Sequence, residues 1–113
     1  MLFTCQTGTD GTLINKPANA TLRPGCSLRL NCSSDITDTP VDWKFTKQGS
    51  TVEQDLTKGG EVTDVFTYLF KIDASSKYDL IATNTSDIGP YVGTYECQDN
   101  VHETATAIVS GKI

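Results

Sequence analysis

The sequence predicts an all-β fold in which two antiparallel sheets pack face to face. Three observations predict it: short runs of alternating apolar and polar residues recur along the 113 residues, turn-forming residues separate these runs, and helical periodicity is almost absent. The composition, 37% hydrophobic and 20% charged, is that of an ordinary globular protein. We therefore expect a single domain over residues 1–113, with 1–11 as an N-terminal extension.

Alternation defines the strands of the first half of the chain. The first strand, Thr12–Lys16 and Ala20–Arg23, is interrupted at Pro17, which is tolerated at a sheet edge. After the turn Pro24-Gly25, the strand Cys26–Cys32 places its even-numbered residues, Leu30 among them, on an apolar face that we expect in the core. The polar segment Ser33–Pro40 is expected to be a loop.

The next strand, Val41–Lys47, alternates in the other phase. Its odd-numbered residues, including Trp43 and Phe45, are expected to point inward, and Asp42, Lys44 and Thr46 outward. The turn Gln48-Gly49-Ser50 leads to a weaker strand, Thr51–Leu56, which the turn Lys58–Glu61 follows.

The second half of the chain continues the pattern, for a total of eight or nine strands. In order, we expect one long or two short strands over Val62–Ile72, a strand over Lys77–Ala82, a polar connection over Thr83–Pro90, a strand over Thr94–Gln98, a tight loop over Asp99–His102 and a last strand over Glu103–Val109.

Charge and motif content argue against several function classes. With a net charge of −5 and nine scattered basic residues, the chain lacks the basic stripe that nucleic acid or an anionic membrane would require. A catalytic triad would depend entirely on His102, the single histidine. The acidic residues Asp35, Asp38 and Asp42 do not have calcium-loop spacing. We expect no enzymatic activity, cofactor or metal.

The four cysteines and three glycosylation sequons indicate an oxidising, extracellular setting. Cys5, Cys26, Cys32 and Cys97 form no C-x-x-C pair, so disulfides are favoured over zinc. The sequons begin at Asn19, Asn31 and Asn84. The stretch Met1-Leu2-Phe3 is too short to be a signal peptide, and we find no apolar run in the sequence long enough to span a membrane. We interpret the chain as a mature ectodomain fragment, tethered by a segment outside it or else secreted.

One set of residues resembles the conserved core pattern of the immunoglobulin superfamily. The matching residues are Cys32, Trp43 and Gly93-Thr94-Tyr95-Glu96-Cys97, and the resemblance covers most of the chain. It implies a Greek-key sandwich in which a Cys32–Cys97 disulfide joins the sheets, Trp43 packs on it and Tyr95 anchors a corner. The 65-residue spacing of the two cysteines favours the variable-type (V-set) arrangement, because it leaves room for extra edge strands.

Two features depart from the family pattern. Tyr91 stands where the family usually has an aspartate, four residues before the tyrosine, so the usual Arg–Asp salt bridge is in doubt and Asp87–Val92 is expected to form a reshaped turn. The Phe-Gly-x-Gly signature of antigen-receptor joining segments is absent from Glu103–Ser110, which argues against an antibody or T-cell receptor domain. Two cysteines, Cys5 and Cys26, are left without a role in the family pattern. Either they pair with each other, or Cys5 is free or forms a disulfide with another chain.

The resemblance implies a recognition domain of a cell-surface receptor or adhesion protein with an immune role. Two surfaces are offered: the end loops, Ser33–Pro40, Gly59–Asp64 and Asp99–His102, and an exposed sheet face. The candidate binding residues are Asp42, Lys44, Thr46, Glu96, Gln98, Asn100 and His102. A protein ligand or a second copy would bind there. The alternatives are a secreted or pathogen-derived binding protein and a structural spacer that binds nothing.

Overall fold

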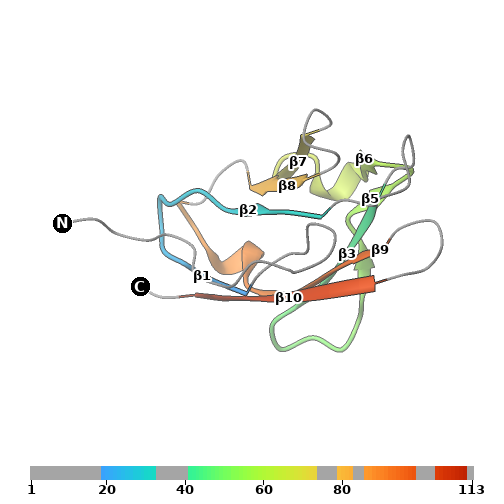
Figure 1. The fold of residues 1–113 in the computed structure, drawn as a ribbon. Helices are drawn as coiled ribbons and strands as arrows, with labels where there is room; N and C mark the ends of the chain where they lie inside the picture. The colour runs from blue at the N-terminus through green and yellow to red at the C-terminus, as the bar shows by residue number, and fades with distance from the viewer. Residues whose placement is uncertain (1–18, 33–40, 74–78, 83–85, 99–103, 112–113) are drawn as a thin grey trace.

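The computed structural model describes residues 19–32, 41–73, 79–82, 86–98 and 104–111, and these form two β layers (Figure 1). The larger sheet has the strand order β1 (Ala20–Leu22), β10 (Thr104–Gly111), β9 (Gly93–Gln98), β3 (Asp42–Lys47) and β4 (Gln54–Asp55). The smaller sheet has the order β2 (Arg29–Leu30), β8 (Asp79–Ala82) and β7 (Phe70–Asp73). A short hairpin, β5 (Thr57–Lys58) with β6 (Glu61–Val62), follows β4.

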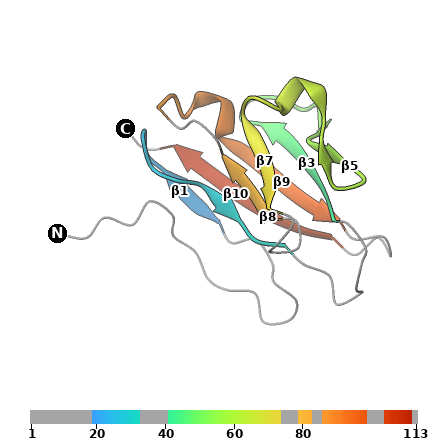
Figure 2. The same cartoon turned by 90° about the horizontal axis from the view of Figure 1, so that it is seen from above.

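Strand pairing brings the first and last described strands together. β1 runs parallel to β10, with Ala20 opposite Val109. The other pairs within the described residues are antiparallel, and β9 lies between β10 and β3 (Figure 2). Residues far apart in the sequence therefore share one continuous sheet.

The core fills the space between the layers. Trp43, Tyr91, Tyr95, Phe45 and Phe70 are its largest fully buried side chains. Phe70, on the smaller sheet, meets Tyr95, on the larger one, edge to face with ring centroids 6.0 Å apart. Such ring pairs add to the free energy gained by burying their area. The predicted inward positions of Leu30, Trp43 and Phe45 are confirmed.

A disulfide between Cys32 and Cys97 ties the two sheets together, which confirms the predicted pairing. Cys32 lies two residues after β2 of the smaller sheet, Cys97 lies in β9 of the larger one, and their Cα atoms are 6.6 Å apart. Trp43 lies opposite Cys97 in the β3–β9 register and belongs to the same core cluster. The indole and the disulfide therefore occupy the same part of the core.

Tyr95 anchors the turn that precedes its own strand. Its buried hydroxyl donates a hydrogen bond of 2.5 Å to the backbone carbonyl of Tyr91. Tyr91 ends the short 3₁₀ helix η3 (Gly89–Tyr91) and is itself fully buried. Its own hydroxyl donates to the carbonyl of Leu69, just before β7, at 3.2 Å. A neutral hydrogen bond thus links the segment before β9 to the segment before β7.

Most predicted strands are confirmed at their centres, but several are shorter than predicted. The strand expected over Cys26–Cys32 reduces to Arg29–Leu30, and that over Thr51–Leu56 to Gln54–Asp55. Val62–Ile72 was expected to hold one long or two short strands. Strand is present only at its two ends, in β6 and β7, because the 3₁₀ helix η1 (Asp64–Phe66) and a turn lie in its middle. There Phe66 is buried beside Phe70, whereas Val65 and Tyr68 are exposed. Apolar composition alone could not reveal that break.

Several predicted segments fall outside the described residues. They are Thr12–Lys16 of the expected first strand, the loops Ser33–Pro40 and Asp99–His102, and the residues Cys5 and Asn84. The predicted Cys5–Cys26 bond is therefore untested. Cys26 itself is half-buried and packs against the core.

Candidate binding face

The side of the larger sheet that faces away from the smaller one presents a set of polar and β-branched side chains, which we call the outer face. Alternation along three adjacent strands, β10, β9 and β3, builds it, and its rows follow the strand register. From one end to the other the rows are Thr104, Gln98 and Asp42; Thr106, Glu96 and Lys44; Ile108, Thr94 and Thr46. All the residues that the sequence predicts to point outward on this face lie in these rows, half-buried between their neighbours: Asp42, Lys44, Thr46, Glu96 and Gln98.

The β10 side of the outer face combines exposed apolar area with uncharged polar groups. Ile108 is 52% exposed, and its neighbours Thr94, Thr106 and Ser110 are exposed as well. None of these four side chains is charged, in a chain with a net charge of −5. A surface of this kind can be covered without desolvating an ion, which is the main cost of burying polar surface.

A shallow hollow of about 280 Å³ lies at the Ile108 end of the outer face. Thr46, Thr94 and Ile108 line it together with the turn Gln48–Ser50. Gly93 lets the backbones approach closely here, because a Cβ at this position would lie 2.3 Å from the carbonyl oxygen of Thr46. Close packing of β9 against β3 thus helps to shape the hollow.

Within the described residues, the charged side chains of the outer face lie on β9, on β3 and around β4 rather than on β10. Lys44 lies opposite Glu96 on β9 and opposite Asp55 on β4. Its ammonium is 3.9 Å from a carboxylate oxygen of Glu53, and both side chains are substantially exposed. Exposed pairs of this kind contribute little to stability, so these groups remain available to a partner.

Asp42, a predicted binding residue, has a structural task instead. Its Oδ1 accepts hydrogen bonds from the hydroxyl of Thr57 at 2.9 Å and from the backbone N–H of Gly60 at 3.0 Å. The buried Thr57 hydroxyl in turn accepts from the backbone N–H of Trp43 at 2.8 Å. Gly59 and Gly60, both at positive φ, make the two-residue turn of the β5–β6 hairpin. Asp42 holds this hairpin onto β3.

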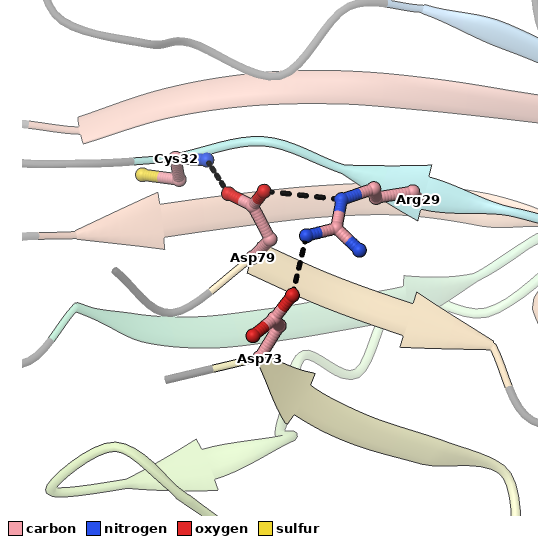
Figure 3. A network of polar contacts seen from close by, with 4 residues as sticks. All are labelled: Arg29, Cys32, Asp73 and Asp79. Atoms are coloured by element: carbon pink, nitrogen blue, oxygen red, sulfur yellow. Dashed lines mark hydrogen bonds and ion pairs between the residues drawn. The ribbon is translucent and has the colours of Figure 1, made fainter. Parts of the chain in front are cut away.

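The smaller sheet carries a charged network on its own outward side (Figure 3). Asp73 and Asp79 lie directly opposite each other on β7 and β8, an unfavourable arrangement for two carboxylates. Arg29 bridges them, with donor–acceptor distances of 2.6 Å to Asp73 and 3.2 Å to Asp79. The hydrogen bond to Asp73 is the main cause that raises the pKa of Arg29. Asp79 also accepts from the backbone N–H of Cys32 at 3.2 Å.

The remaining predicted site residues divide into placed and unplaced ones. Asn19 and Asn31 are both exposed, the first just before β1 and the second just after β2. Asn84, Asn100 and His102 lie outside the described residues, as do two of the three predicted end loops.

Sequence reasoning missed Ile108, Thr94 and the hollow. The alternation within Glu103–Val109 contained the signal for Ile108, because Ala107 and Val109 occupy the buried phase. The outer face also includes the outward-pointing residues of the last predicted strand, Glu103–Val109, beside those of Val41–Lys47 and Thr94–Gln98. The hollow depends on how turns from different parts of the chain meet, which no local pattern reveals.

The described residues contain neither a candidate metal site nor a helix that could span a membrane. Nowhere in this part of the chain do three or more His, Cys, Asp or Glu side chains gather as a metal site would require. The same residues include no helix of the length and hydropathy needed to cross a membrane.

Comparison with known proteins does not assign the chain to a family. No protein-family model matches the sequence, and no curated protein matches it significantly.

Proposed function

We propose that this chain is an extracellular, variable-type immunoglobulin-like domain that recognises a protein partner through its outer face. The observation that carries the functional part is the uncharged, partly apolar surface around Ile108, which lies beside a hollow on an open sheet face. The Cys32–Cys97 disulfide suggests a location outside the cytoplasm, where such bonds persist.

Three features of the fold support the immunoglobulin-like part of the proposal. The disulfide joins the two sheets, Trp43 lies beside it in the core, and the Tyr95 hydroxyl bonds to the backbone four residues upstream, as in the tyrosine corner of that fold. The variable-type assignment is supported by β4, which extends the larger sheet beyond β3 where the variable type adds strands.

A protein partner fits the outer face better than a small molecule does. The hollow is shallow and open, whereas small-molecule sites bury most of their ligand. The threonine-rich rows offer hydroxyl donors and acceptors, and Ile108 supplies an apolar centre. With Lys44 and Glu96 at the charged side, such a surface suits a modest contact of about 1,200 Å² or less in total.

The test is a binding screen with a pair of matched variants. The secreted chain, made multivalent, is presented to a panel of cell-surface ectodomains, and its self-association is followed by sedimentation across concentration. Ile108→Lys puts a charge into the outer face. Val65→Lys, the control, makes the same change at a β-branched residue of similar exposure, 66%, in η1 outside that face.

We expect Ile108→Lys to lower the affinity for the partner by about tenfold or more, because a charge in the centre of an interface must be desolvated. Val65→Lys should bind like the wild type. Equal binding by both variants would place recognition elsewhere on the chain. A strict monomer that binds nothing in the panel would favour the spacer function. Membrane attachment of the full gene product would separate a receptor from a secreted binding protein.

A further inference from the structure

We infer that Asn19 carries an N-linked glycan that covers the outer face at its β1 edge, beside Ile108. Asn19 begins the sequon Asn19-Ala20-Thr21, and its side chain is exposed. The sequon, the hydrogen bond of Asn19 and the β1–β10 register support the glycan and its position. The consequence for binding, that the glycan competes with a partner for the surface around Ile108, rests on the proposed function.

A hydrogen bond fixes the amide of Asn19. Its Oδ1 accepts from the backbone N–H of Ile108 at 2.8 Å. Because only the oxygen of an amide can accept, the other branch, Nδ2, points away from that N–H. Nδ2 is the atom to which an N-linked sugar is joined, so the hydrogen bond and the glycan use different atoms of one side chain.

The covalent step needs a lipid-linked oligosaccharide diphosphate as donor, the sugar donor of N-glycosylation. Nδ2 attacks the anomeric carbon of the first sugar, a C–N bond forms, and the C–O bond to the diphosphate breaks. The lipid diphosphate leaves with the bonding electrons, and the amide nitrogen loses one proton. The product keeps Oδ1 as an acceptor for the Ile108 N–H.

Strand register places this glycan on the outer face. Ala20 lies opposite Val109 and Thr21 opposite Ser110. Ala20 and Val109 are both buried in the core, so the alternate residues, Asn19 and Ile108, lie on the outward side. A sugar on Nδ2 therefore projects at the β1 edge, next to the exposed side chain of Ile108 and the hollow that it lines.

Asn31, the other sequon asparagine that the structure describes, lies away from the outer face. Asn31 follows β2 in the smaller sheet, on the opposite layer, and Asn84 is outside the described residues. The sequence has no N-x-[ST] triplet within residues 41–58 or 86–111, which contain β3, β4, β9 and β10. Of the sequons placed by the structure, Asn19 is thus the one that borders the outer face.

The test is made on the chain secreted from a eukaryotic cell. Glycopeptide mass spectrometry reads the occupancy of Asn19. Hydroxyl-radical footprinting then compares side-chain oxidation before and after enzymatic removal of the glycan, which converts Asn19 to Asp and so preserves an acceptor for the Ile108 N–H. Val52, 65% exposed and just before β4 at the opposite edge of the sheet, is the internal control.

We expect an occupied Asn19, a loss of oxidation at Ile108 in the glycosylated chain, and equal oxidation of Val52 in both forms. Thr21→Ala and Asn19→Asp, which remove the sequon in two different ways, should both match the deglycosylated chain. An unmodified Asn19, or equal oxidation of Ile108 with and without the glycan, would overturn the inference. Failure to bind any partner would refute the proposed function but would not change the occupancy of Asn19 or the oxidation of Ile108.

Discussion

At the scale of single residues, the hydroxyl of Tyr95 shows how a polar atom can be kept in an apolar core. It is buried, and its one donor is used by the carbonyl of Tyr91. Burial raises the pKa of Tyr95 well above its usual value, with a smaller contribution from Tyr91, because the charged phenolate would be poorly solvated there. The folded protein therefore favours the neutral side chain.

Tyr95→Phe should lower the free energy of unfolding by about 1–2 kcal/mol near neutral pH, since it removes a buried hydrogen bond and leaves a carbonyl with one partner fewer. Denaturant unfolding of both proteins measures this difference. An unchanged midpoint would show that the hydroxyl contributes nothing to the corner.

The same residue predicts an alkaline dependence of stability. The folded pKa of Tyr95 is raised above the unfolded value of about 10, so its contribution is complete below about pH 10 and is lost as the pH rises toward the folded pKa. The gap in stability between wild type and Tyr95→Phe should therefore narrow above about pH 10. A gap that stays constant or widens there would contradict the raised pKa.

Asp42 illustrates an outward residue whose role is structural. Asp42→Ala should destabilise the fold by about 1–3 kcal/mol, because two hydrogen bonds are lost and the buried Thr57 hydroxyl loses its acceptor. Thr46→Ala, four residues further along β3 on the same face, is the control and should change stability by less than about 0.5 kcal/mol. Thermal and denaturant unfolding compare the two variants, and equal losses would refute the structural role of Asp42.

At the scale of elements, the Arg29 network holds three short strands in register. β2 has two residues, so backbone pairing with β8 gives it few hydrogen bonds. Arg29 adds side-chain bonds to β8 and, beyond it, to β7, and Asp79 adds one to the backbone of Cys32 (Figure 3). Asp79 is buried, whereas the side chain of Asp73 is 28% exposed.

Replacing the two aspartates by alanine should therefore have unequal effects. Asp79→Ala loses two bonds in a buried position and should cost about 2–3 kcal/mol, whereas the more solvated Asp73→Ala should cost about 1 kcal/mol or less. Urea unfolding gives both values. A larger loss of stability for Asp73→Ala than for Asp79→Ala would mean that the network depends mainly on the exposed Arg29–Asp73 ion pair.

The elements also show how far sequence patterns reach. Alternation correctly placed Leu30, Trp43 and Phe45 inward because a period of two leaves each strand one way to bury its apolar face. It failed over Thr63–Leu69, where the buried Phe66 is held by a 3₁₀ turn rather than a strand. It also could not assign Asp42, because the bond to Gly60 depends on a hairpin 18 residues away.

At the scale of the whole molecule, the fold depends on a few contacts between distant parts of the chain. The Cys32–Cys97 disulfide and the rings around Phe70 join one sheet to the other, and the Tyr91–Leu69 hydrogen bond joins the segments before β9 and β7. The sequence predicted the disulfide through the family resemblance. The parallel pairing of β1 with β10 and the hollow beside Ile108 depend on the closed assembly, and no local pattern encodes them.

Loss of the disulfide should weaken the whole domain in a single transition. The bond closes a loop between residues 65 positions apart, for which the chain-entropy model gives about 4 kcal/mol. The double variant Cys32→Ala/Cys97→Ala should lose stability of that order in denaturant unfolding, and the Tyr95 corner should unfold with the rest. A loss of less than about 1 kcal/mol would mean that the sheets are held together chiefly by packing.

The most direct test of the two-layer account is disulfide mapping of the non-reduced, deglycosylated protein after digestion with trypsin. Cys32 falls in the peptide 30–44 and Cys97 in 78–112, while Cys5 and Cys26 share the peptide 1–29 because Lys16 and Arg23 each precede a proline. We expect a species in which the peptide 30–44 is linked to 78–112 and the two separate on reduction. A peptide 30–44 linked to 1–29, or recovered with a free thiol, would contradict it.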